Sequence, residues 1–200
     1  GTDSMRRYLL ASRKGEGIDC SHVVCDPLQR TGFHFKARVT YGSDPFVESH
    51  RGGSAASHMS VAYVCPSCLL SARHLHATGI FPALSSTTLP AARMAMGLMR
   101  SAGRPVSYDP NLRPGFWPST EAMRTTLNEL ATHADWVLPG LEEGLLLTGE
   151  SSPEGVAQFY LNLGAQLVVV KLGSQGAYFQ NAQESGYVAG FPVAQVVDTV

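Results

Sequence analysis

Segments typical of strands alternate with segments typical of helices from Ala72 onward, and no other feature of the sequence constrains its fold as much. Strands are predicted at residues 73–81, 105–110, 135–140 and 166–173, and helices at 89–103, 119–134, 141–149 and 154–165. The last of these strands, QLVVVKLG, is almost continuously apolar, which is typical of a central strand covered on both faces. Short connections between alternating strands and helices predict an α/β fold with a mostly parallel sheet and right-handed crossovers.

The predicted helices carry residues that commonly start or stop a helix. Ser119 is a typical N-cap, and an acidic residue follows in the first turn, where the helix dipole favours it. Ser152 and Pro153 form a second start signal, with proline at the first helical position. Gly103 and Gly149 are expected to end two of the helices.

The first 60 residues are predicted to be irregular apart from short strands. Residues 22–53 alternate β-branched or aromatic residues with polar ones, as strands with one solvated face do. Gly-Ser-Asp-Pro at residues 42–45 predicts a turn between two of these strands. A chain of 200 residues is long enough for one well-buried domain, so we expect a single domain over residues 1–200.

The composition excludes several classes of protein. A hydrophobic content of 44% and a mean hydropathy of -0.01 are those of an ordinary globular protein. The formal net charge of -1 argues against a nucleic-acid-binding protein, which normally has a basic surplus. No apolar run approaches the ~18 residues of a membrane span. The first ten residues contain no signal-peptide core, so a cytoplasmic location is predicted.

Four cysteines leave two interpretations open: Cys20, Cys25, Cys65 and Cys68. In the first, the C-x4-C and C-x2-C pairs form a four-thiolate zinc site. In the second, they are unrelated thiols, which is favoured because an apolar stretch without glycine-rich knuckles follows Cys68. A disulfide is expected least of all in a reducing compartment.

Candidate functional residues follow the predicted strands, at the edge where open parallel sheets bind ligands. Arg113 lies in DPNLRP, and its planar guanidinium can contact a carboxylate or phosphate at two points. The flanking prolines restrict the backbone, and Asp109 and Asn111 can hold the turn through side-chain-to-backbone hydrogen bonds. A purely structural pair between Arg113 and Asp109 is the alternative.

A second arginine favours a ligand-binding role. Arg51 ends the strand-like FVESHR and precedes GGSAAS, whose small residues allow close approach of the backbone. Two arginines near one crevice predict an acidic small molecule as the ligand. His34 and His50 either add hydrogen bonds there or are surface and strand-packing histidines.

A glycine-rich turn, KLGSQGAY at residues 171–178, follows the buried strand. Gly173 and Gly176 permit a tight turn and close approach of a nucleotide, although the segment matches neither a Walker A loop nor G-x-G-x-x-G. Glu142 and Glu143 follow the preceding strand. They either orient a magnesium ion through water or simply open a helix favourably.

Together these segments resemble the ribokinase (PfkB) family of carbohydrate kinases, and within it the branch that phosphorylates 2-keto-3-deoxygluconate. The matching segments cover nearly the whole chain in family order: GTDSM, RTGFHFK, RGGSAAS, HATGIFPALS, YDPNLRPGFWPS, ADWVLPGLEEG, VVVKLGSQGAY and VVDTV. The DPNLRP segment with its downstream tryptophan, alongside SAAS, is specific to the sugar-acid branch. The resemblance implies a ribokinase-like three-layer α/β/α sandwich, with a small β lid and lid-adjacent strands within about residues 22–52.

The resemblance also implies an activity, ligands and residue roles. ATP and Mg²⁺ would serve phosphoryl transfer to the terminal hydroxyl of the sugar acid, giving 2-keto-3-deoxy-6-phosphogluconate, and a homodimer could form through the lid strands. Arg113 would bind the substrate carboxylate with help from Arg51 and His34, and Glu143 would help to organise Mg²⁺ indirectly. The implied nucleotide-binding residues are Lys171, Gly173, Ser174 and Gly176.

The chain also departs from the family pattern. After an Asp-Thr-Val like the one ending at Val200, the family continues with Gly-Ala-Gly-Asp. The amides of that segment stabilise the transferring phosphate, and its aspartate is the general base. We therefore expect the catalytic aspartate beyond Val200 and no catalytic residue within residues 1–200, a stretch that we expect to be incomplete at both ends and inactive alone.

Individual positions differ from the family pattern as well. Arg6 replaces a usual glycine, and Gly140 replaces a usual asparagine that commonly neighbours the metal and phosphates. His34 and His50 lie where tyrosines are common.

Two alternatives stay open beside a sugar-acid kinase. The first is a relative of fructokinase or ribokinase that acts on a neutral sugar and needs no paired arginines. The second is a truncated, non-catalytic member of the family that binds a ligand.

Overall fold

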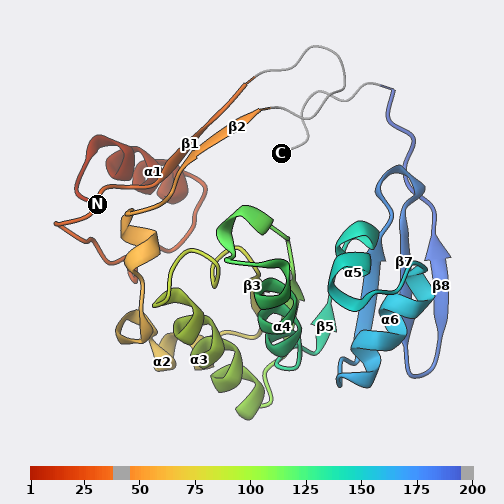
Figure 1. The fold of residues 1–200 in the computed structure, drawn as a ribbon. Coiled ribbons are helices and arrows are strands. Elements are labelled where there is room, and N and C mark those ends of the chain that lie inside the picture. Colours follow the sequence, from red (N-terminus) through yellow and green to blue (C-terminus); the bar gives the residue numbers. More distant parts are fainter. Residues whose placement is uncertain (38–45, 195–200) are drawn as a thin grey trace.

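The computed structural model describes residues 1–37 and 46–194 (Figure 1). A small antiparallel sheet of β1 (Phe33–Lys36) and β2 (Val47–His50) stands apart from the main sheet, with α1 (Ser4–Gly15) beside it. These two strands lie within the range predicted for the lid.

Two sequence predictions lie outside the described residues. One is the turn at 42–45, and the other is the final VVDTV, which ends at Val200. The structure therefore does not test the expected position of the catalytic aspartate beyond Val200, which stays a prediction.

The larger sheet has six strands in the order β3-β4-β5-β6-β7-β8. Their bounds are β3 Leu75–Thr78, β4 Val106–Asp109, β5 Trp136–Val137, β6 Leu167–Lys171, β7 Ala177–Asn181 and β8 Ser185–Val188. Neighbours from β3 to β6 pair in parallel, whereas the β6–β7 and β7–β8 pairs are antiparallel. The predicted mostly parallel sheet is confirmed, with β4, β5 and β6 inside it.

The strand predicted at 73–81 was too long and was wrongly expected at the centre of the sheet. β3 ends at Thr78 and is the first strand in the order of the described sheet. Beyond it the Gly79 N–H still donates to the Asp109 carbonyl at 2.9 Å, but the next hydrogen bonds join residues 80–83 and 81–84 in tight turns. The apolar residues Ile80 and Phe81 therefore belong to a turn.

The helices form a row against the main sheet (Figure 1). α3 is joined to α4 by the Arg93–Glu129 ion pair at 2.7 Å, and α5 contacts both α4 and α6. The helices are α2 Pro66–Ser71, α3 Thr88–Ser101, α4 Thr120–Ala131, α5 Leu141–Thr148 and α6 Pro153–Asn162. Short 3-10 turns lie at Ala55–His58 (η1), Val61–Tyr63 (η2), Pro114–Phe116 (η3) and Gly173–Gln175 (η4).

The predicted start and stop residues of these helices are confirmed. Ser119 and Ser152 each accept a hydrogen bond from the backbone N–H three residues on, at 3.1 Å in both cases. Pro153 occupies the first turn of α6. Gly103 and Gly149 adopt φ values of 65° and 84°, a left-handed conformation that favours glycine and ends α3 and α5.

The expectation of an irregular amino-terminal region was wrong for residues 4–15, which form α1. None of its residues is fully buried, so the helix lacks the apolar core face that identifies the others. Its cap is Asp3, whose Oδ1 accepts from the Arg6 N–H at 2.9 Å. Asp3 Oδ2 accepts from the Thr31 N–H at 2.7 Å and so ties α1 to the segment leading into β1.

We expect this tie to weaken in acid. The N–H of Thr31, followed by that of Arg6, lowers the pKa of the Asp3 carboxyl from 3.8 to about 2. A carboxylate with a lowered folded-state pKa stabilises the fold above about pH 4, and this contribution disappears as the pH falls towards about 2. Thermal unfolding of Asp3→Asn should show a lower Tm than the wild type at neutral pH, and the difference should shrink as the pH falls from about 4 through about 2. A Tm difference between the variant and the wild type that stays constant across this pH range would contradict a stabilising role for the ionised Asp3 carboxylate.

The core lies between the helix row and the sheet. Its largest fully buried side chains include Tyr108 of β4, Tyr160 of α6 and Met96 of α3. In the described part of the chain, no helix is both long and apolar enough to cross a bilayer. Because the core fixes β4 and β6 in one sheet, the loops that follow their carboxyl ends are brought to the same edge.

Candidate functional site

The loop after β4 is held by Asp109, as predicted. Asp109 Oδ1 accepts from the Asn111 N–H at 3.1 Å, and Oδ2 accepts from Lys171 Nζ at 2.6 Å. The alternative pair between Arg113 and Asp109 is not formed, because Asp109 pairs with Lys171 instead. Arg113 is exposed, and its Nη1 donates to the Leu112 carbonyl at 2.7 Å. Among residues 1–37 and 46–194 it forms no ion pair, so its guanidinium is available to an anionic ligand.

Glu143 joins the Arg113 loop to the start of α5. Its Oε1 accepts from the Leu112 N–H and its Oε2 from the Gly140 N–H, both at 2.8 Å. Lys171 Nζ lies 4.0 Å from Oε2. The structure thus brings Glu143 and Lys171 together with Asp109, a cluster that we call the β4–β6 edge. Glu142 is exposed and does not take part in these contacts.

The glycine-rich turn after β6 has the tight geometry predicted for it. Gly173 and Gly176 adopt φ values of 59° and 100°. A Cβ on Gly176 would collide with the carbonyl of Val188, so the close approach at this glycine is to the chain's own backbone. Gly173 and Ser174 are exposed and follow Lys171 after one intervening residue, Leu172. Contact of this turn with a nucleotide stays a prediction.

A cavity of about 700 Å³ lies between α1, β1, η1 and the segment at residues 22–26. His34 and Arg51 both line it, as expected of residues that bind one ligand. Arg113, which was expected near the same crevice as Arg51, is not among its lining residues, so this cavity does not bring the two arginines together as predicted. His50 packs instead, with its ring 4.8 Å from that of Phe33 in a stacked arrangement, which supports the strand-packing alternative for this histidine.

A second arginine lines the same cavity and was not proposed from the sequence. Arg6 of α1 faces the cavity, and its Nε is buried without a hydrogen-bond partner among the residues that the structure describes. The sequence did contain a sign of Arg6, because this arginine replaces a residue that is usually glycine in the resembled family. The two guanidinium groups of Arg6 and Arg51 outnumber the one carboxylate in the lining, that of Asp26, so this cavity, which we call the cationic cavity, is suited to an anionic small molecule.

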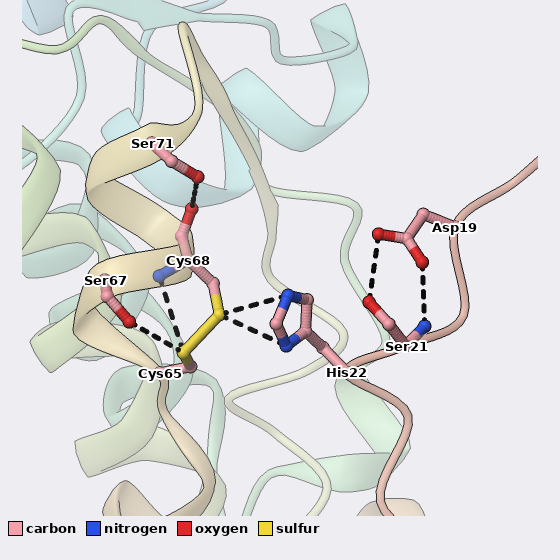
Figure 2. The surroundings of a disulfide bond; sticks show 7 residues. All are labelled: Asp19, Ser21, His22, Cys65, Ser67, Cys68 and Ser71. Atoms are coloured by element: carbon pink, nitrogen blue, oxygen red, sulfur yellow. Dashed lines mark hydrogen bonds between the residues drawn. A yellow bond between two sulfur atoms is a disulfide. The ribbon is translucent and has the colours of Figure 1, made fainter.

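The four cysteines do not assemble into a single site. Cys65 and Cys68 are joined by a disulfide, with their Cα atoms 5.3 Å apart, contrary to the expectation of unrelated thiols (Figure 2). They meet because Cys65 is the N-cap of α2 and Cys68 lies in its first turn. Cys20 and Cys25 are free and partly buried.

Comparison with known proteins decides the family. All of residues 1–200 match the sequence profile of the pfkB family carbohydrate kinases. The chain belongs to the PfkB family. This PfkB chain is 44% identical to 2-dehydro-3-deoxygluconokinase of Bacillus subtilis (strain 168), over 100% of the chain and 62% of that relative. It therefore spans less than two thirds of the length of that protein.

Two further relatives carry two different kinase names. It is 33% identical to 2-dehydro-3-deoxygluconokinase of Thermoproteus tenax, over 89% of the chain and 54% of that relative. It is 30% identical to Fructokinase-1 of Oryza sativa, over 100% of the chain and 61% of that relative.

Solved structures confirm the ribokinase-like α/β fold of this PfkB chain. A PfkB protein from Polaromonas sp. JS666 is 68% identical with a TM-score of 0.93, over 96% of this chain and 65% of that one. A putative ribokinase II from E. coli in complex with ATP and Mg²⁺ is 29% identical with a TM-score of 0.85, over 98% of this chain and 62% of that one.

Proposed function

We propose that this chain provides the sugar-acid and nucleotide contacts of an ATP-dependent kinase for 2-keto-3-deoxygluconate. The kinase would transfer the γ-phosphoryl group to the terminal hydroxyl and form 2-keto-3-deoxy-6-phosphogluconate. The observation that carries the proposal is the cationic cavity, where Arg6 and Arg51 lie with His34. A neutral sugar offers these guanidinium groups no charged partner, whereas the carboxylate of a sugar acid does. Two relatives named 2-dehydro-3-deoxygluconokinase support this substrate.

Arg113 is proposed to contact the carboxylate from the loop after β4. Its guanidinium is exposed and forms no ion pair among the described residues, while the loop that carries it is fixed by Asp109 and Glu143. A fixed loop with a free guanidinium loses little conformational entropy on binding an anion, which favours affinity. Arg113 would thus share the single carboxylate of the substrate with the arginines of the cationic cavity, and all three guanidinium groups would select for the acid.

The nucleotide side is proposed to lie along the β4–β6 edge and the turn after it. Gly173 and Ser174 are exposed, and Gly173 has a positive φ. A phosphate can therefore approach the backbone of this turn. Lys171 adds a cation at the start of this turn. Each Glu143 oxygen accepts one amide hydrogen bond and keeps a further lone pair, which fits a water-mediated contact to Mg²⁺. When bound, Mg²⁺ neutralises charge that develops on the phosphates.

A binding experiment tests the proposed substrate. Binding is the appropriate readout, because the Gly-Ala-Gly-Asp segment of the family does not occur within residues 1–200. In isothermal titration calorimetry, 2-keto-3-deoxygluconate should bind at least about 30-fold more tightly than fructose or ribose, which corresponds to roughly 2 kcal/mol for a desolvated charge pair. Equal or tighter binding of fructose would replace this proposal with a kinase of a neutral sugar.

The proposal includes a cytoplasmic location and a homodimer formed through β1 and β2. Exposed apolar side chains on and beside these strands support the dimer, since Phe35 and Phe46 are 62% and 72% exposed. Sedimentation analysis of the chain measures the oligomeric state directly.

A further inference from the structure

A cluster of metal-binding side chains lies at α2 and has no role in the proposed kinase chemistry. The ligand atoms of His22, Cys65 and Cys68 all lie within 4.8 Å of one another. Cys68 Sγ is 3.3 Å from His22 Nδ1 and 3.5 Å from His22 Nε2 (Figure 2). The histidine precedes Cys68 by 46 residues, so the fold, and not the local sequence, brings these groups together.

Hydrogen bonds shape the backbone on both sides of this cluster. The Asp19 carboxylate accepts from the Ser21 N–H at 2.8 Å and from Ser21 Oγ at 3.0 Å, which forms the turn directly before His22 (Figure 2). On α2, the Cys68 N–H donates to Cys65 Sγ at 3.4 Å. An N–H directed at a cysteine sulfur also stabilises the negative charge of a thiolate.

The donor set matches the preferences of zinc. Two thiolates and one imidazole are soft and borderline donors, which select Zn²⁺ over Mg²⁺ or Ca²⁺. In a tetrahedral site with Zn–S near 2.3 Å and Zn–N near 2.0 Å, sulfur and nitrogen lie roughly 3.5 Å apart. The distances of 3.3 and 3.5 Å between Cys68 Sγ and the His22 ring nitrogens are close to this value.

We propose that the reduced form of this cluster binds one Zn²⁺ through the sulfurs of Cys65 and Cys68 and one imidazole nitrogen of His22, with water in the fourth position. The disulfide is the oxidised, metal-free form of the same site. A small dithiol reductant breaks the sulfur–sulfur bond by supplying two electrons and two protons, and itself becomes a disulfide. Zinc then displaces the two thiol protons to solvent, so the metal-bound and disulfide forms exclude each other.

The site adjoins the cationic cavity. His22 also lines that cavity, together with the neighbouring Val23 and Val24. A metal ion on His22 would therefore anchor one wall of the cavity to α2. The zinc site nevertheless stands independently of the proposed substrate, because its test requires no sugar and no ATP.

Metal binding to the 200-residue chain tests this inference. The chain is reduced with dithiothreitol, freed of reductant without oxygen, loaded with Zn²⁺ and measured for zinc by elemental analysis. About one zinc per chain is expected, and Co²⁺ in its place should give the absorption bands of tetrahedral thiolate coordination. The disulfide form should bind none, with thiol titration showing only Cys20 and Cys25 as free.

Single substitutions identify the ligands. His22→Ala and Cys65→Ser should each weaken zinc affinity by more than about 100-fold, since loss of even an outer-shell partner costs ~10- to 100-fold. Cys20→Ser and Cys25→Ser are matched controls that should bind zinc as the wild type does. His22 is exposed, so its replacement leaves folding intact even if Cys65→Ser does not. Absence of zinc from the reduced wild type, or unchanged affinity in His22→Ala, would overturn the site.

Discussion

Replacing Arg113 by alanine is expected to weaken binding of 2-keto-3-deoxygluconate by about 30-fold to several-thousand-fold. Truncating one partner of a desolvated charge pair costs roughly 2–5 kcal/mol, because the other charge is left unpaired. The melting temperature should hardly change, since the polar contact of this side chain within residues 1–37 and 46–194 is one hydrogen bond from Nη1 to the Leu112 carbonyl. Affinity for ATP should also stay nearly constant. Calorimetric titration and thermal unfolding of the same variant measure all three quantities.

Two further variants show whether the loss of affinity comes from the charge of Arg113, from the shape of its guanidinium group or from its position in the loop. Arg113→Lys should recover only part of the affinity, because an ammonium keeps the charge but not the planar fork of donors. Arg104→Ala is the matched control, since Arg104 is also exposed but precedes β4, at the other end of the same strand. A destabilised Arg113→Ala protein with normal affinity per folded molecule would show that the arginine serves the fold and not the ligand.

The helices that cover the core could be predicted from the sequence because their signals are local. Ser119 and Ser152 cap α4 and α6 through hydrogen bonds that span three residues, and Gly149 ends α5 in a left-handed conformation. Such patterns are readable in any short window of sequence. α1 was not predicted because none of its residues is fully buried. Its sequence therefore lacks the apolar stripe that marks a helix facing the core.

The site was predictable only in part because most of its contacts join distant positions. Asp109 was correctly expected to hold its own turn, an interaction between residues two apart. Its partner Lys171 is 62 residues away, and the Glu143 partner Leu112 is 31 residues away. Residue types limit such pairs but do not determine them, since the sheet order decides which loops meet. Arg6 and His22 were missed for the same reason, because only the folded chain brings them to the cationic cavity.

Replacing Glu143 by alanine is expected to lower the free energy of unfolding by roughly 2–4 kcal/mol. The carboxylate accepts two backbone N–H groups, from Leu112 and Gly140, and each hydrogen bond to a charged group contributes about 1.5–3 kcal/mol. The expected loss is smaller than the sum of these two contributions, because the Glu143 side chain is 23% exposed and water can partly satisfy the freed amides. Urea unfolding followed by circular dichroism measures the loss.

Glu143→Gln and Glu142→Ala make the prediction specific. The glutamine carbonyl accepts one amide, but its NH₂ group cannot accept the second, so about half of the loss should remain. Glu142 is the exposed neighbour on the same turn of α5, and its replacement should change stability by less than about 0.5 kcal/mol. Because Glu143 also fixes the loop of Arg113, Glu143→Gln should weaken sugar-acid binding even where the protein stays fully folded. Equal stability of the alanine variants at 142 and 143, with sugar-acid affinity unchanged in Glu143→Gln, would show that this carboxylate does not hold the two loops together.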